Sequence, residues 1–434
     1  MDKKGLLGIS PLIVFIVFYL VSVLICGDFA KVPLTSAFFF TSIYSIAIAR
    51  GLSLPDRILV FGRGAGASNV MFMIWLFLAA GAFAACAQAM GSVQATVDLI
   101  LHILPGRYIF IGLFLAGCVL SMATGSGVGS IVAVMPIAME IANITGTSMA
   151  LLSSIVVCSA MFGDNLSFIS DTTVIATTSQ GCELKDKFRV NLRIVAIPAL
   201  IVIAIYLYLG KDMVDVTIPS TVEYWKILPY LTLLVMAISG VDVLITLITG
   251  ITICALEGFI LGTFGYAEFL NAIGSGINGM GFLLILILMA SGIAAIIQHN
   301  GGMEYLVKVC TRFVKGRKSA EGCIAVLTGL MTACTSTNTI AIISVSGIVK
   351  ELSQKFGVDP RRAASLMDTS SCVVLELIPY SAHILAAVVF TGISPISVLP
   401  FMFYPALLGI AVVISILIGN RKYSPAGLKK PDLA

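Results

Sequence analysis

Residues 282–290 read FLLILILMA, nine apolar residues in succession. A membrane strand of a β-barrel alternates apolar and polar residues, and this run does not alternate. Apolar stretches of about 17–25 residues recur along the rest of the chain, and that length crosses a bilayer core as a helix. The sequence therefore predicts an all-α polytopic membrane protein with about 12–14 membrane segments.

The overall composition excludes a soluble enzyme. Hydrophobic residues make up 59% of the 434 residues and charged residues only 11%, whereas a soluble globular chain is about 25% charged. So few charges cannot cover a water-facing surface of this size. The net charge is +4, and the basic residues lie in short loops, where they orient a membrane protein. We therefore expect a multi-pass protein surrounded by membrane lipid, with no nucleic-acid partner.

An internal repeat divides the chain into two halves. An offset of 210 residues aligns Gln88 with Gln298, and it aligns the pair Gly106-Arg107 with Gly316-Arg317. Small residues keep the same register: Ala80, Ala84, Ala85 and Gly91 match Ala290, Ala294, Ala295 and Gly301. We therefore expect two transmembrane repeats, residues 1–210 and residues 211–434.

Loop charges predict that the two repeats have opposite orientations. The loop 304–321 carries five Lys or Arg residues, whereas Arg107 and His102 are the basic groups of its counterpart, 98–107. By the positive-inside rule the first loop is cytoplasmic and the second is external. Both termini are then cytoplasmic and the protein lies in the cell inner membrane. Inverted repeats with broken or re-entrant helices at the midplane are typical of secondary transporters, and a homodimer is an open alternative to a monomer.

Two equivalent segments become polar within apolar surroundings. Residues 124–130 read TGSGVGS, and residues 334–339 read CTSTNT. Glycine and hydroxyl residues at membrane depth indicate interrupted helices, whose free carbonyl and hydroxyl oxygens can hold a hard cation or a substrate. The candidate residues are Thr124, Ser126, Thr335, Thr337 and Asn338. The alternative is close packing of helices through small residues.

A third polar segment, residues 163–173, reads GDNLSFISDTT. Asp164 and Asp171 are seven residues apart, so a continuous helix would place both on one face. A charge at membrane depth costs at least a few kcal/mol, and such residues usually line a site or a water-filled path. The candidate ion and proton ligands are Asp164, Asp171, Asn165, Ser167, Thr172 and Thr173. The alternative is an ordinary acidic loop.

The equivalent segment of the second half contains Asp368 and Glu376, about two helical turns apart. Pro379 predicts a helix break after them, and Tyr380 and His383 follow. We expect the two carboxylates to bind ions or protons and Tyr380 and His383 to contact a substrate. Either carboxylate could instead pair with Arg361 or Arg362.

Two further carboxylates, Glu140 and Glu257, lie within apolar helices. Neither has a polar neighbourhood in the sequence. We therefore rank both below the candidates in the polar segments.

These motifs resemble the NhaC-type Na⁺/H⁺ antiporter family, within the wider ion transporter superfamily. That family carries G-D-x-x-S-P-x-S-D-T-T, and residues 163–173 are similar to it. Residues 124–130 resemble its T-G-T-S-x-G-T element, and Gly91 and Gly301 stand where members have a helix-breaking glycine. Asp368 followed by Ile378-Pro379-Tyr380 resembles its second-half signature. Phe168 in place of the motif's proline and the charge of Glu376 are departures from the family pattern.

The resemblance implies antiport of Na⁺ and H⁺ by alternating access, with no enzymatic activity and no cofactor besides the transported ions. A carboxylate away from water favours its protonated form, whereas a bound Na⁺ favours the ionised form. One carboxylate can therefore hold either ion but not both. We expect Asp164 and Asp171 to be these switching carboxylates and the metal ligands for Na⁺, exposed alternately as the two halves rock.

Three other functions are compatible with parts of the pattern. A Na⁺- or H⁺-coupled carrier or exchanger of a small organic acid or amino acid could use the same fold, with Asn338, Glu376, Tyr380 and His383 contacting the substrate. An intramembrane protease is disfavoured because the chain has no HExxH motif and because Met161 stands where a Gly-x-Gly-Asp motif needs glycine. A channel is disfavoured because inverted repeats with buried carboxylates suit alternating access.

Overall fold

The computed structural model describes residues 3–27, 31–103, 106–167, 170–211, 223–239 and 241–418. Within these ranges the regular structure is helical throughout, which confirms the predicted all-α class. The first ten helices are α1 (Lys3–Cys26), α2 (Leu34–Ile48), α3 (Leu54–Ala65), α4 (Ser68–Met90), α5 (Ser92–Ile103), α6 (Ile109–Thr124), α7 (Gly127–Thr145), α8 (Met149–Leu166), α9 (Asp171–Gln180) and α10 (Leu184–Gly210).

The other eleven helices repeat this order. They are α11 (Leu228–Ile238), α12 (Val243–Leu261), α13 (Tyr266–Gly279), α14 (Gly281–His299), α15 (Gly302–Thr311), α16 (Arg317–Thr335), α17 (Asn338–Phe356), α18 (Pro360–Leu375), α19 (Ala382–Thr391), α20 (Pro395–Val398) and α21 (Phe403–Ile418). The helices α7 and α17 both have 19 residues, and α9 and α19 both have 10. In these two pairs, helices at equivalent positions of the predicted repeats have equal lengths.

The helices of the described ranges include several membrane spans. Seven are long and apolar enough to cross a bilayer, or eight if the bent pair Ala382–Thr391 and Pro395–Phe401 forms one span. Three shorter apolar helices accompany them: Leu34–Ile48, Gly106–Met122 and Phe403–Ile418. The chain is therefore a multi-pass membrane protein.

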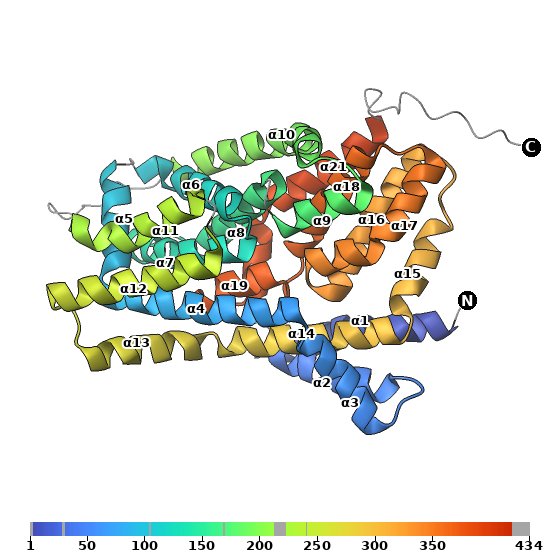
Figure 1. The fold of residues 1–434 in the computed structure, drawn as a ribbon, viewed down its shortest axis with the longest axis horizontal. Helices are drawn as coiled ribbons and strands as arrows, with labels where there is room; N and C mark the ends of the chain where they lie inside the picture. Colours follow the sequence, from blue (N-terminus) through green and yellow to red (C-terminus); the bar gives the residue numbers. More distant parts are fainter. Residues whose placement is uncertain are drawn as a thin grey trace, which may run out of the picture.

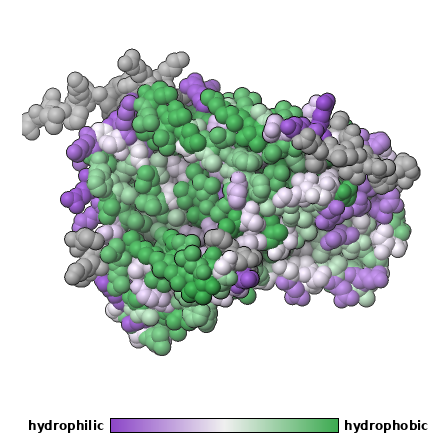
Figure 2. Space-filling view, turned by 180° about the vertical axis from the view of Figure 1, so that it is seen from behind, coloured by the Kyte–Doolittle hydropathy of each residue, from purple (hydrophilic) through white to green (hydrophobic). Residues whose placement is uncertain are grey.

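Two short helices mark the opposite ends of the molecule. The helices α4, α12, α13 and α14 run along the long axis, with α5 across one end and α15 across the other (Figure 1). The helices α1 and α21 have their outer ends on the α15 side (Figure 1). Figure 2 shows hydrophobic side chains over the middle of the molecule and hydrophilic ones toward both ends. The long axis thus follows the expected membrane normal, and the equivalent helices α5 and α15 lie on opposite faces, as inverted repeats require.

The two sequence halves are interleaved in space. From the first half, α9 packs against α17 and α18, and α4 packs against α12 and α13; from the second half, α19 packs against α7 and α8, and α14 packs against α2 and α3. The helices therefore form two groups that each contain both repeats. We name them the α4/α14 group (α1–α5 and α11–α15) and the α8/α18 group (α6–α10 and α16–α21).

Glycine allows the closest approach inside the α4/α14 group. A Cβ atom added to Gly276 of α13 would lie 2.2 Å from the carbonyl oxygen of Gly81 in α4. At the equivalent crossing, a Cβ atom added to Gly64 of α3 would lie 2.7 Å from the carbonyl oxygen of Ser291 in α14. Contact between backbones of this kind replaces hydrophobic burial as the source of helix association in a membrane.

Candidate functional site

A central cavity of about 440 Å³ lies where five helices begin. Four of them, α7, α9, α17 and α19, form two equivalent pairs from the two repeats, and the fifth is α12. The polar residues of its lining include Ser126, Asp164, Ser170, Thr172, Asp242, Thr337, Asn338 and His383. Helix starts carry partial positive charge and unpaired N–H groups, so the cavity favours a buried carboxylate.

Helix breaks on both repeats open the cavity. The helix α6 ends before Gly125, which has a φ of 65°, and α16 ends before Ser336, which has a φ of 57°. Among the described residues, Ser336 is the one non-glycine residue with a positive φ. This conformation is costly for a residue with a Cβ atom. The strain at Ser336 therefore marks the second break as a feature that the surrounding packing enforces.

Asp164 projects into this cavity from the last turn of α8. Its side chain is almost fully buried. Ser170 Oγ donates a hydrogen bond of 2.5 Å to Oδ1, and Thr172 Oγ1 lies 3.4 Å from Oδ2. The thiol of Cys372 lies 3.8 Å from the same Oδ2. These partners are neutral, so the carboxylate keeps its capacity to bind a cation or a proton.

Asp368 of α18 lies next to this site but has a cationic partner. Lys187 Nζ of α10 is 2.7 Å from Asp368 Oδ2, and both side chains are at most 1% exposed. Asn191 Nδ2 donates to the same oxygen over 2.8 Å. The other carboxylate oxygen, Oδ1, is buried and has no hydrogen-bond partner among the described residues. The pair joins the two repeats and is electrically neutral.

The Lys187 ammonium also holds the broken end of α8. It donates to the carbonyl oxygen of Asn165 over 3.2 Å and to Thr173 Oγ1 over 2.5 Å. Asn191 Nδ2 donates to the same Asn165 carbonyl over 2.9 Å. These bonds satisfy a carbonyl oxygen that the helix break leaves without an intrahelical partner.

A second acid–base pair lies beside the cavity. Glu376 is fully buried at the end of α18 and is hydrogen-bonded to His383 Nδ1. His383 lines the cavity, whereas Glu376 lies behind it, and in the described part of the chain Glu376 Oε2 has no hydrogen-bond partner. A Cβ atom added to Gly127 would lie 2.7 Å from His383 Cε1, so glycine at the start of α7 makes room for the imidazole ring.

The remaining predicted site residues separate into two sets. Ser126, Thr172, Thr337 and Asn338 line the central cavity. Asn165 and Thr173 are buried beside it, and no described residue forms a hydrogen bond with Asn165 Oδ1. By contrast, Ser167 Oγ donates to the Met122 carbonyl oxygen, and Thr335 Oγ1 donates to that of Met331. The side chains of Asp171 and Thr124 lie outside the described part of the structure, as does Phe168.

Two details of the described structure differ from the sequence analysis. Tyr380 does not line the central cavity, because its hydroxyl group donates to the Ala333 carbonyl oxygen and its ring packs against Phe15 and Phe38. Neither Arg361 nor Arg362 pairs with Asp368 or Glu376. Arg361 pairs with Asp359 at the start of α18, and Arg362 pairs with Glu321.

Sequence reasoning missed Lys187 and Asn191, because they lie in a basic stretch that resembles an orienting loop. The helical spacing of this stretch contains a signal that could have found them. Lys187 and Asn191 are four residues apart and share a face with the buried residues Val190, Ile194 and Val195. A lysine on the apolar stripe of a helix needs a partner, unlike the exposed Lys185 on the other face.

The family model of the Na⁺/H⁺ antiporter family matches residues 3–211 and 215–420. The chain belongs to the Na⁺/H⁺ antiporter family. The resemblance to its NhaC-type members is confirmed by a relative from Alkalihalophilus pseudofirmus named Na(+)/H(+) antiporter NhaC. The two are 20% identical over 93% of this chain and 94% of the relative.

Other relatives of this antiporter family member have related names. One from Bacillus subtilis, named Malate-2H(+)/Na(+)-lactate antiporter, is 20% identical over 91% of this chain and 92% of the relative. Among solved structures, the Alcanivorax borkumensis YdaH transporter covers 94% of this chain and 98% of its own, at 13% identity and a TM-score of 0.43.

Proposed function

We propose that this chain exchanges Na⁺ for H⁺ across the membrane at the central cavity, with Asp164 binding one ion or the other. One observation carries the proposal. Asp164 is a buried carboxylate of the cavity whose partners are the neutral groups of Ser170, Thr172 and Cys372. The neighbouring Asp368 is already neutralised by Lys187. Asp164 is therefore the carboxylate that must acquire a positive charge from a transported ion.

The atoms around Asp164 suit a small hard cation. Its carboxylate oxygens and the hydroxyl oxygens of Ser170 and Thr172 are hard ligands, which bind Na⁺ in preference to soft metals. The hydroxyl groups can rotate so that their lone pairs face the ion. A proton on the carboxylate would be held by the same hydroxyl oxygens, so binding of Na⁺ and of H⁺ is mutually exclusive.

The charges at the two ends of the molecule support one orientation of the protein in the membrane. The α15 end carries the basic residues of the 304–321 loop, and we assign it to the cytoplasm by the positive-inside rule. The helices α1 and α21 have their outer ends on that side (Figure 1), so both termini are assigned to the cytoplasm. We assign the protein to the cell inner membrane, with α5 on its external face.

Substitution of Asp164 in proteoliposomes tests the proposal. We expect Asp164→Asn to abolish Na⁺-driven proton movement, measured with a pH-sensitive dye, because the amide can neither bind a proton nor balance Na⁺. Glu257→Gln is the matched control, since Glu257 is a carboxylate of an apolar helix outside the cavity, and it should exchange at the wild-type rate. Exchange that survives in Asp164→Asn would contradict the proposal.

The pH dependence of exchange tests whether Na⁺ and H⁺ share one site. If they compete for Asp164, a lower pH raises the apparent KM for Na⁺ and leaves the maximal rate at saturating Na⁺ unchanged. A KM that stays constant over the working pH range would indicate separate sites. Adding malate or lactate to the same vesicles tests the organic-acid alternative, and we expect neither acid to stimulate the exchange.

A further inference from the structure

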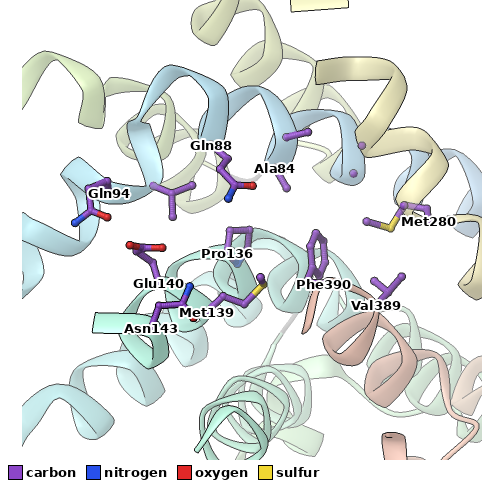
Figure 3. Close-up of a pocket in the computed structure, with 15 residues that line it drawn as sticks. Ala84, Gln88, Gln94, Pro136, Met139, Glu140, Asn143, Met280, Val389 and Phe390 are labelled. Atoms are coloured by element: carbon purple, nitrogen blue, oxygen red, sulfur yellow. The ribbon is translucent and has the colours of Figure 1, made fainter. Parts of the chain in front are cut away.

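A second cavity, of about 420 Å³, lies between the centre of the molecule and its α5 end. Its walls come from α4, α5, α7, α13 and α19 (Figure 3). Most of the lining is apolar, but four polar side chains reach it: Gln88, Gln94, Glu140 and Asn143. The two glutamines and Asn143 are exposed, so the cavity is open to its surroundings.

Glu140 is the charged group of this cavity. Figure 3 shows its carboxylate pointing into the cavity from α7, on the side where Gln88 and Gln94 enter from the opposite wall. In the described part of the chain Glu140 has no hydrogen-bond or ion-pair partner, whereas Gln94 Nε2 donates to Asp98. An unpaired carboxylate on an apolar helix is stable only where water or a cation reaches it.

The second cavity lies further along the same helices as the central cavity. Three helices, α4, α7 and α19, line both cavities. The central cavity is lined by Leu76 of α4, Val128 of α7 and His383 of α19. Gly81, Pro136 and Val389 line the second cavity, five to eight residues further along the same helices. At 1.5 Å per residue the second cavity lies roughly 8–12 Å closer to the α5 end.

Buried apolar side chains lie between the two cavities along these helices. Between the two sets of lining residues, Phe77 of α4, Val132 of α7 and Ala386 of α19 are fully buried members of one hydrophobic core. The helix α7 packs against both α4 and α19. An ion beside Glu140 is thus separated from the central cavity by buried apolar residues.

We infer that the cavity around Glu140 is the vestibule through which Na⁺ reaches the central cavity from the α5 end, and that Glu140 binds the hydrated cation there. The inference rests on the proposed function, because it concerns the route to Asp164. A carboxylate between low-dielectric walls raises the local concentration of cations. The amide oxygens of Gln88 and Gln94 can replace part of the hydration shell. The second repeat has the same spacing in α17, with Glu351 and Gln354 where α7 has Glu140 and Asn143.

Labelling of a cysteine in the cavity tests the vestibule without relying on transport. Cys26, Cys182 and Cys310 are the native cysteines that are not buried, and the other seven are buried. In a variant with these three changed to serine, we expect Asn143→Cys to react with a charged methanethiosulfonate reagent added to one side of the membrane. Modification should block Na⁺/H⁺ exchange, and Na⁺ should slow the labelling. A cysteine that does not react, or that reacts without effect on exchange, overturns the inference.

Charge neutralisation tests the role of Glu140 itself. We expect Glu140→Gln to raise the KM for Na⁺ about three- to tenfold and to leave kcat within about twofold, because the residue raises cation capture and not turnover. Glu257→Gln makes the same charge change at the same end of the molecule without lining either cavity, and it should change neither constant. An unchanged KM in Glu140→Gln overturns the inference. The labelling result distinguishes this failure from a failure of the proposed site, because Asn143→Cys can be labelled in an Asp164→Asn background.

Discussion

At the scale of single residues, two aspartates a short distance apart have different tasks. Asp164 is surrounded by hydroxyl groups and a thiol, and Asp368 is bound by Lys187 and Asn191. A buried carboxylate with a permanent cation cannot easily accept a second one. A buried carboxylate with neutral partners requires one. The difference in partners, more than the shared residue type, assigns ion exchange to Asp164 and support of the broken helix to Asp368.

The pairing of Asp368 with Lys187 predicts the effect of removing the lysine side chain. We expect Lys187→Ala to destabilise the protein by about 3–5 kcal/mol, because it leaves Asp368 charged and buried without a cation. Thermal unfolding in detergent measures the loss. Lys185→Ala is the matched control, since Lys185 is exposed two residues earlier on the same helix. It should unfold at the wild-type temperature.

A double variant separates charge from packing in the same experiment. Adding Asp368→Asn to Lys187→Ala removes the unpaired charge and should recover part of the lost stability. If the double variant is no more stable than Lys187→Ala, the loss comes from packing, and the ion-pair interpretation is wrong.

The sequence predicts residues whose type is unusual for their surroundings, but not their partners. Asp164 was found because a charge is costly in an apolar helix. Lys187 was missed because a lysine near a basic loop is ordinary until the fold buries it. The direction of the Tyr380 side chain could not be predicted, because a helix break at Pro379 leaves the direction of the following side chains undetermined by periodicity. Contacts between residues far apart in the chain depend on how the two repeats pack.

At the scale of helices, the breaks rather than the long spans create the site. Glycine, hydroxyl residues and Pro379 were sufficient to predict interruptions in both repeats, and helices end at Thr124, Leu166, Thr335 and Leu375. The helices α5 and α15 overlap the stretches 98–107 and 304–321, which the sequence analysis interprets as loops because of their charges. Tertiary packing determines that these stretches are helical.

The helix breaks after α6 and α16 have different residues at the same position, glycine in one and serine in the other. Exchanging the residue type at each break should change the stability in opposite directions. Gly125 and Ser336 both have a left-handed backbone, which costs about 1–2 kcal/mol for a residue with a Cβ atom. We expect Gly125→Ala to lower the free energy of unfolding by about that amount, and Ser336→Gly to raise it by up to about 1 kcal/mol. Thermal unfolding in detergent measures both changes.

The control for this pair is a helical glycine with free space around it. A Cβ atom added to Gly347, within α17, would meet no atom within 4 Å. Gly347→Ala should be neutral or stabilise the helix by up to about 1 kcal/mol. If Gly125→Ala behaves like Gly347→Ala, the left-handed conformation at the break does not contribute to stability.

At the scale of the whole molecule, the interleaved repeats determine which parts can move. Rocking of residues 1–210 against the rest would pull α9 away from α17 and α18, and α4 away from α12 and α13. It would also break the buried Lys187–Asp368 pair. Displacement of the α8/α18 group against the α4/α14 group preserves all these contacts. Both cavities lie between the two groups, so such a displacement would open one end and close the other.

Reversible cross-links distinguish the two kinds of movement. A Cβ atom added to Gly129 of α7 would lie 2.6 Å from Val243 Cγ1 of α12, across the boundary between the groups. We expect Gly129→Cys with Val243→Cys to lose Na⁺/H⁺ exchange on oxidation and to regain it on reduction, so that each sample is its own control.

Within the α8/α18 group, a Cβ atom added to Gly329 of α16 would lie 3.9 Å from Val374 Cβ of α18. Gly329→Cys with Val374→Cys should therefore exchange equally well when oxidised and when reduced. Full exchange by the oxidised first pair would show that the groups do not move at this contact. Inhibition of the second pair alone would place the movement inside the α8/α18 group.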